Sequence, residues 1–103
     1  MKIKQTSGYS QRTAKKFITK GVPIKFVGPE LEPKFKWENG KKTDNIEAYE
    51  TWFIQEGLPP FQVKFSSQVE LPDYESIVEF DDLQACEVRN NVYFKADGMK
   101  VVK

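Results

Sequence analysis

Hydrophobic and polar residues alternate along most of this chain, in short runs separated by turn residues. A period of two is typical of β-strands that bury one face. The pattern predicts strands over residues 22–27, 33–37, 61–65, 77–80, 83–89, 92–96 and 99–102, with 77–89 forming one strand bent at Asp81-Asp82. Asn39-Gly40 and Asn90-Asn91 are dipeptides that favour tight hairpin turns.

Two segments allow more than one interpretation. Residues 10–20 could form a short helix capped by Ser10 and closed by Gly21 at the C′ position, or residues 15–19 could begin the first strand. Residues 45–55 could form a helix capped by Asp44 or a strand. Their Tyr, Thr, Trp, Phe and Ile content, just after a hairpin signal, favours the strand.

Many short strands must close a barrel or stack two sheets to cover their edges. At this length, a five-stranded OB-like barrel fits better than a seven-stranded sandwich. The expected fold is therefore mainly β, with a short helix or loop between strands three and four. Residues 1–20 would be a basic N-terminal arm or short helix, and residues 21–103 the barrel domain. An unpaired edge strand would also allow a homodimer.

The composition excludes several classes of function. The 103 residues are 39% hydrophobic and 30% charged, which is ordinary for one soluble domain. The absence of histidine excludes Ser-His-Asp triads and most transition-metal sites. We expect no enzyme, no catalytic residue, no metal and no cofactor. Cys86 is the single cysteine, no apolar run approaches the about 18 residues of a membrane span, and the first residues do not resemble a signal peptide. A cytoplasmic protein with no membrane partner is therefore expected.

The formal net charge of +1 conceals a strong asymmetry. Residues 1–29 contain seven basic residues and no acidic one, whereas residues 44–82 contain ten acidic residues and only Lys64 as a base. A local basic surface attracts phosphates over about 8–10 Å, so a neutral total does not exclude a nucleic-acid partner.

Several segments resemble small OB-fold proteins of bacterial conjugative plasmids and integrative elements. Residues 79–85 and 90–99 are similar to the closing strands of those proteins, and residues 34–43 and 61–64 to their central hairpin; the resemblance spans about residues 21–102. The resemblance implies an accessory protein of DNA replication or transfer that binds single-stranded DNA, with RNA as the alternative. It also implies a helicase, relaxase or polymerase as protein partner.

A sequence-tolerant single-strand binder needs aromatic rings on which bases stack and cations that follow the phosphates. If residues 45–55 form a strand, Tyr49 and Phe53 share its outer face, about 7 Å apart. The candidate stacking residues are Trp37, Tyr49, Phe53 and Tyr93. The candidate phosphate contacts are Lys25, Lys34, Lys36, Lys41, Lys42, Lys64 and Arg89.

Large aromatic residues in a small domain more often belong to the core. The core is expected to contain Phe26, Phe35, Trp52, Phe61, Phe65 and Phe94. Glu47 and Glu50 lie close to the candidate platform in sequence and would repel a phosphate chain. A helix over residues 45–55 would remove the platform altogether.

A second hypothesis uses the acidic residues instead of the basic ones. In that hypothesis the acidic surface of residues 44–82 docks onto a basic protein, such as a replication or defence enzyme. A small interaction or inhibitor protein of this kind would bind no oligonucleotide, and its capture would depend on Glu70, Asp73 and Glu75.

Overall fold

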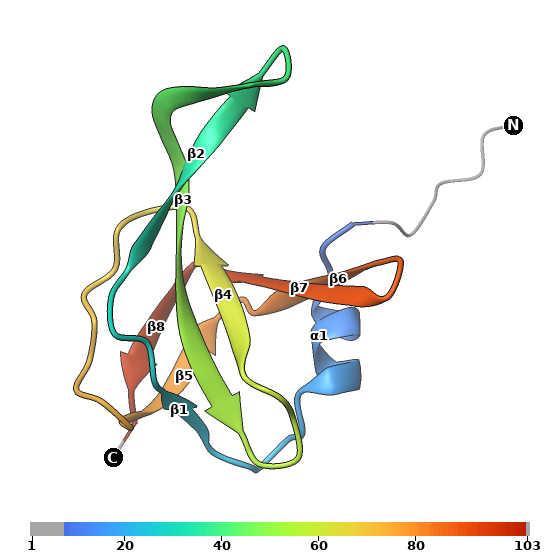
Figure 1. Ribbon diagram of the computed structural model, residues 1–103. Coiled ribbons are helices and arrows are strands. Elements are labelled where there is room, and N and C mark those ends of the chain that lie inside the picture. The colour runs from blue at the N-terminus through green and yellow to red at the C-terminus, as the bar shows by residue number, and fades with distance from the viewer. Residues whose placement is uncertain (1–7, 103) are drawn as a thin grey trace, which may run out of the picture.

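The computed structural model describes residues 8–102, in which a short helix precedes a series of strands (Figure 1). The helix α1 spans Gln11–Phe17. The strands are β1 Ile24–Phe26, β2 Glu32–Glu38, β3 Lys41–Gln55, β4 Phe61–Phe65, β5 Ile77–Asp81, β6 Gln84–Val88, β7 Asn91–Ala96 and β8 Gly98–Val101. The expectation of a mainly β fold is confirmed. No helix in this part of the chain is long and apolar enough to cross a membrane.

The strands of the described residues form one sheet with the order β6-β7-β4-β3-β1-β5-β8, and β2 pairs with β3 outside this path. Neighbours are antiparallel except β4 and β7, which are parallel. These residues contain eight strands in an open sheet, so the expected five-stranded barrel is not confirmed. Asp82 adopts a left-handed conformation (φ 52°) between β5 and β6, and Asp97 separates β7 from β8.

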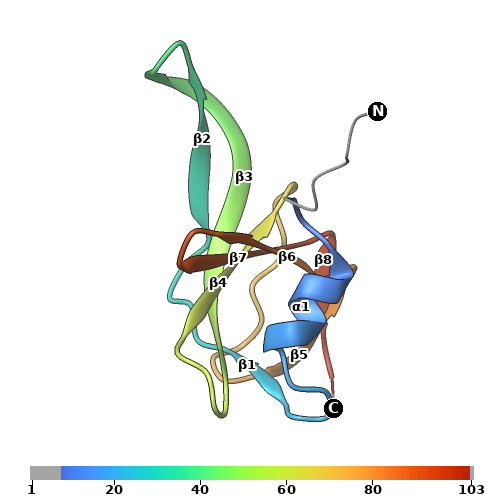
Figure 2. The same cartoon turned by 90° about the vertical axis from the view of Figure 1, so that its right-hand side faces the viewer.

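Strand β3 confirms the extended interpretation of residues 45–55. It pairs with β1 and β2 along one edge and with β4 along the other. Asn39 (φ 52°) and Gly40 (φ 76°) form the predicted turn from β2 into β3. The β2–β3 hairpin then extends beyond the rest of the molecule (Figure 2).

The hydrophobic core is built around Phe53, which is completely buried. Its ring centre lies 4.9–6.5 Å from those of four other phenylalanines, Phe26, Phe61, Phe65 and Phe80. The expected burial of Phe26, Phe61, Phe65 and Phe94 is confirmed, and Cys86 is also buried. The expectation for Phe35 is wrong, because this residue is half-buried on the hairpin, beyond the reach of the core.

The helical interpretation of residues 10–20 is confirmed in part. The Ser10 hydroxyl accepts a hydrogen bond from the Thr13 backbone N–H (3.1 Å), which is a typical N-cap. The helix ends at Phe17, because Ile18 is already extended, so Gly21 lies in a later turn and not at C′ as predicted.

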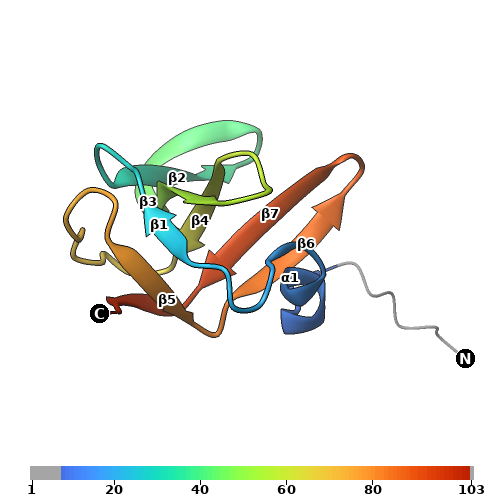
Figure 3. The same ribbon diagram turned by 90° about the horizontal axis from the view of Figure 1, so that it is seen from below.

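Helix α1 lies against β6, and Figure 3 shows the two side by side. Ser10 and Ala85 exchange two backbone hydrogen bonds (2.9 and 3.0 Å), which attach the start of the helix to β6. The segment after the helix is held by Gln55, whose buried side chain bonds the backbone of Thr19 and Val22. Residues 1–7 of the predicted basic arm lie outside the described residues.

Two connections complete the fold. Residues 66–76, between β4 and β5, form a loop without a helix. The sequence had allowed either a short helix or a loop here. The turn between β6 and β7 consists of Arg89 and Asn90, one residue earlier than the predicted Asn90-Asn91.

Gly28 is required by a close approach between the β1–β2 connection and β3. A Cβ atom at this position would lie 1.8 Å from Oγ1 of the buried Thr51, whose hydroxyl donates a hydrogen bond to the Glu30 carbonyl (3.0 Å). We predict that Gly28→Ala lowers the free energy of unfolding by about 2–4 kcal/mol, because Thr51 must move and lose this bond. Urea denaturation measures the change.

Gly8→Ala is the control for Gly28→Ala, because no atom lies within 4 Å of its Cβ position. Its free energy of unfolding should change by less than about 0.5 kcal/mol. A Gly28→Ala protein as stable as the original chain would contradict the described packing of β1 and β2 against β3.

Candidate nucleic-acid interface

Two hairpins border one face of the sheet. The β2–β3 hairpin points upward in Figure 1, and the β6–β7 hairpin points to the right. Between them lies the side of β3, β4 and β7 that faces away from the core, called the outer face below. Antiparallel pairing of β3 with β4 and parallel pairing of β4 with β7 make this face continuous.

The strand register places cations and aromatic rings together on the outer face. Cross-strand partners point to the same side of a sheet. Lys64 of β4 is the partner of Glu50 in β3 and of Lys95 in β7. Trp52 and Tyr93 are each two residues away from one of these positions, so they share the same face. Their exposed fractions are 37% and 46%.

Tyr9 reaches the outer face from the segment before α1. The ammonium groups of Lys64 and Lys95 lie 5.3 and 4.7 Å from the centre of its ring, within cation–π range. Burial raises the pKa of Tyr9 to about 12, with smaller contributions from Cys86 and Glu50. Tyr9 is therefore a neutral phenol at physiological pH and adds no negative charge to this surface.

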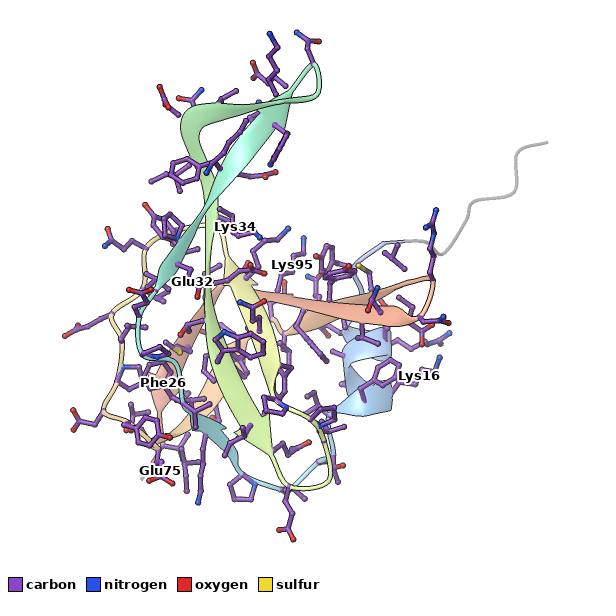
Figure 4. The ribbon with its side chains drawn as sticks, in the orientation of Figure 1. Lys16, Phe26, Glu32, Lys34, Glu75 and Lys95 are labelled. Atoms are coloured by element: carbon purple, nitrogen blue, oxygen red, sulfur yellow. The ribbon has the colours of Figure 1, made fainter. Side chains whose placement is uncertain are left out.

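Lys34 of β2 also points toward the outer face, and Figure 4 shows it and Lys95 in the angle between the two hairpins. Lys34 forms an ion pair with Glu50 (3.3 Å), whose side chain is only 15% exposed. This pairing neutralises the carboxylate that the sequence placed near the candidate platform. Lys34 consequently contributes less free positive charge than Lys64 and Lys95, which make no ion pair within residues 8–102.

The β2–β3 hairpin carries a separate exposed group of residues. Trp37 is 65% exposed and Ile46 is 47% exposed. The Lys42 ammonium lies 4.6 Å from the centre of the Phe35 ring, and Lys36 pairs with Glu38 at 3.5 Å. With the exposed Lys41, the hairpin thus combines apolar rings with three lysines, apart from the body of the protein.

The β6–β7 turn presents Arg89, which is exposed and has a φ of 58°. This left-handed conformation favours glycine, so an arginine here is strained. Lys25 is also exposed, but it lies on β1, two strands away from Lys64. The predicted cations therefore lie in three places. Some are on the two hairpins, some form a central group on the outer face, and Lys25 lies apart on β1.

Two predicted stacking residues are not where the sequence analysis placed them. Phe53 was expected on an outer face, but it is the centre of the core, so its predicted role is wrong. Tyr49 is half-buried and shares the core-facing side of β3 with Thr51 and Phe53. Trp52, which was expected in the core, is instead exposed on the outer face. The assignment of the two faces of β3 was inverted.

Three residues of the outer face were missed: Tyr9, Trp52 and Lys95. Lys95 had a usable signal, since it lies two residues after Tyr93 in an alternating strand. Tyr9 had none, because its position depends on the hydrogen bonds between Ser10 and Ala85, far apart in sequence.

Other kinds of site find little support in residues 8–102. No three His, Cys, Asp or Glu side chains of this range are grouped so that they could hold a metal ion. The acidic loop residue Glu75 lies at the lower left of Figure 4, well away from Lys34 and Lys95.

Comparison of the chain with models of protein families, with curated proteins and with solved structures gives no match. The function must therefore be argued from the geometry of this molecule.

Proposed function

We propose that this protein binds single-stranded DNA without sequence preference, through the outer face between its two hairpins. The observation that carries the proposal is the grouping of Lys64 and Lys95, free of ion pairs within the described residues, with the exposed rings of Trp52 and Tyr93. A single strand needs both kinds of group at once, since ammonium groups bind phosphates and rings stack on bases.

We further propose that the strands act as a five-stranded OB-like barrel. In this interpretation β1 with β2, β5 with β6 and β7 with β8 are each one bent strand, while β3 and β4 are single. The pairing supports it, because β1 contacts both β3 and β5 and β4 joins β7 in parallel, as a closed ring of the merged strands would require. The left-handed Asp82 provides the bend between β5 and β6.

The chemistry of the face favours a single strand over a duplex. Stacking on Trp52 or Tyr93 requires an exposed base face, which a duplex hides inside its helix. Each stacked base contributes about 1–3 kcal/mol whatever its identity, so sequence tolerance follows. Trp37 on one hairpin and Arg89 on the other border the face and can contact the strand as it leaves.

The biological setting is proposed from the family resemblance alone. The protein would act in the cytoplasm as an accessory factor in replication or transfer of a mobile genetic element. RNA is the alternative ligand, because stacking and phosphate contacts do not distinguish the two backbones.

We predict that the double substitution Lys64→Gln/Lys95→Gln weakens binding to a labelled strand of about 20 nucleotides by roughly tenfold at moderate salt. The change removes two cations without removing a ring. Fluorescence anisotropy at two salt concentrations, with the strand and the matching duplex, measures it. The original chain should bind the strand more tightly than the duplex, and its affinity should fall as salt rises.

The control is Lys16→Gln/Lys100→Gln, which removes the same charge from α1 and β8, where both lysines are exposed and paired with glutamates. Binding by the control should stay close to that of the original chain. An equal loss in both double variants would show that only net charge matters. Absence of strand binding by the folded original chain at low salt would refute the proposed function.

A second prediction concerns the strained Arg89. Arg89→Gly should stabilise the protein by about 0.5–1 kcal/mol, because glycine adopts a positive φ without steric cost. The same change should weaken DNA binding and make its salt dependence shallower by about 0.7 in log–log slope, the effect of one lost phosphate contact. Urea denaturation and anisotropy measure the two effects.

Arg89→Lys keeps both the charge and the strain, so it should match the original chain in stability and salt dependence. A glycine variant that binds DNA as well as the original chain would exclude Arg89 from the interface.

A further inference from the structure

The lysine pair Lys64 and Lys95 is unusual among the lysines of the described residues. The two are register partners on parallel strands, and neighbouring strands are only about 4.8 Å apart. Like charges placed opposite one another destabilise a sheet. Neither lysine has an ion-pair partner within residues 8–102.

The ring of Tyr9 contacts both lysines and reduces the repulsion between them. Both ammonium groups lie over it, at 5.3 and 4.7 Å from its centre, so the same ring attracts two cations. The backbone next to Tyr9 is fixed, since Ser10 exchanges two hydrogen bonds with Ala85 and caps α1. Tyr9 is therefore a positioned residue that keeps two ammonium groups together before any ligand arrives.

A pocket of about 240 Å³ opens beside this group. Lys64, Lys95 and Ser66 line it and provide donors for an anion, and Tyr9 lines it as well. Glu47 and Asp97 line it as well. The two carboxylates balance the two ammonium groups, so the pocket as a whole is not strongly positive. An anion of low charge suits it better than one of high charge.

We propose that Lys64 and Lys95, held together by Tyr9, bind a single phosphodiester group, and that Glu47 and Asp97 disfavour phosphates with two negative charges. A phosphodiester carries one negative charge, whereas a terminal or free phosphate carries about 1.5–2 at neutral pH. The inference rests on the proposed function, because the nucleic-acid strand supplies the diester. Tyr9 acts through the two lysines, so it is a positioning residue.

The test compares Tyr9→Phe, Tyr9→Leu and the control Tyr74→Leu, using an unphosphorylated oligothymidine of about 20 nucleotides. Tyr9→Phe keeps the ring and should bind within about twofold of the original chain. Tyr9→Leu loses the ring and should bind about 3- to 30-fold more weakly, with a log–log salt slope shallower by about 0.7. Tyr74 is 67% exposed in the loop between β4 and β5, and its replacement should change nothing.

A second experiment compares inorganic phosphate with oligothymidine. It follows the NMR signals of the Lys64 and Lys95 side chains in the original chain and in Glu47→Gln as each ligand is added. In the original chain, oligothymidine should shift both signals at concentrations where inorganic phosphate does not. Glu47→Gln should strengthen phosphate binding more than oligothymidine binding, because it removes one repulsive charge.

The outcomes separate the inference from the proposed function. If the original chain binds oligothymidine and folded Tyr9→Leu binds it equally well, the inference is wrong and the proposed function stands. If Tyr9→Leu does not fold, the original chain still tests the inference. NMR signals of Lys64 and Lys95 that do not shift when oligothymidine is added overturn it. Equal responses to inorganic phosphate and oligothymidine overturn the selection for a diester. Failure of the original chain to bind oligothymidine removes both proposals.

Discussion

Burial of Phe53 is the constraint on which the rest of the structure depends. Four phenylalanine rings surround this side chain, and none of its surface is exposed. Because side chains alternate along a strand, an inward Phe53 requires an outward Trp52. The same alternation brings Glu50 to the outer face, and pairing with β4 then adds Lys64. A single buried ring thus determines which residues of β3 and β4 lie on the outer face.

Much of the fold could be predicted from local patterns. Strand β4 has the predicted bounds, since its alternation is regular and Pro59-Pro60 marks its start. The Asn39-Gly40 turn was predictable because few dipeptides accept two positive φ values. The orientation of β3 could not be predicted in the same way. Ile46 and Ile54 on one side of the strand and Tyr49 and Phe53 on the other are both candidates for burial in the core. Both faces of that strand are apolar enough to be buried.

The candidate site was harder to predict than the fold because it depends on pairing between distant segments. Lys64 and Lys95 become neighbours only through the parallel contact of β4 with β7. Tyr9 joins them only through the link from Ser10 to Ala85. The strong charge of residues 1–29 suggested a basic arm, yet the two lysines that meet over the Tyr9 ring come from β4 and β7. Total charge by segment was therefore a poor guide to the candidate interface.

The location of the binding surface can be measured directly by titrating isotopically labelled protein with a single-stranded oligonucleotide and following its NMR spectrum. We expect the largest changes at the Trp52 indole N–H and along β4 and β7, with little change in α1 and β8. Changes concentrated in α1, or in the acidic loop between β4 and β5, would contradict the claim that the outer face binds nucleic acid.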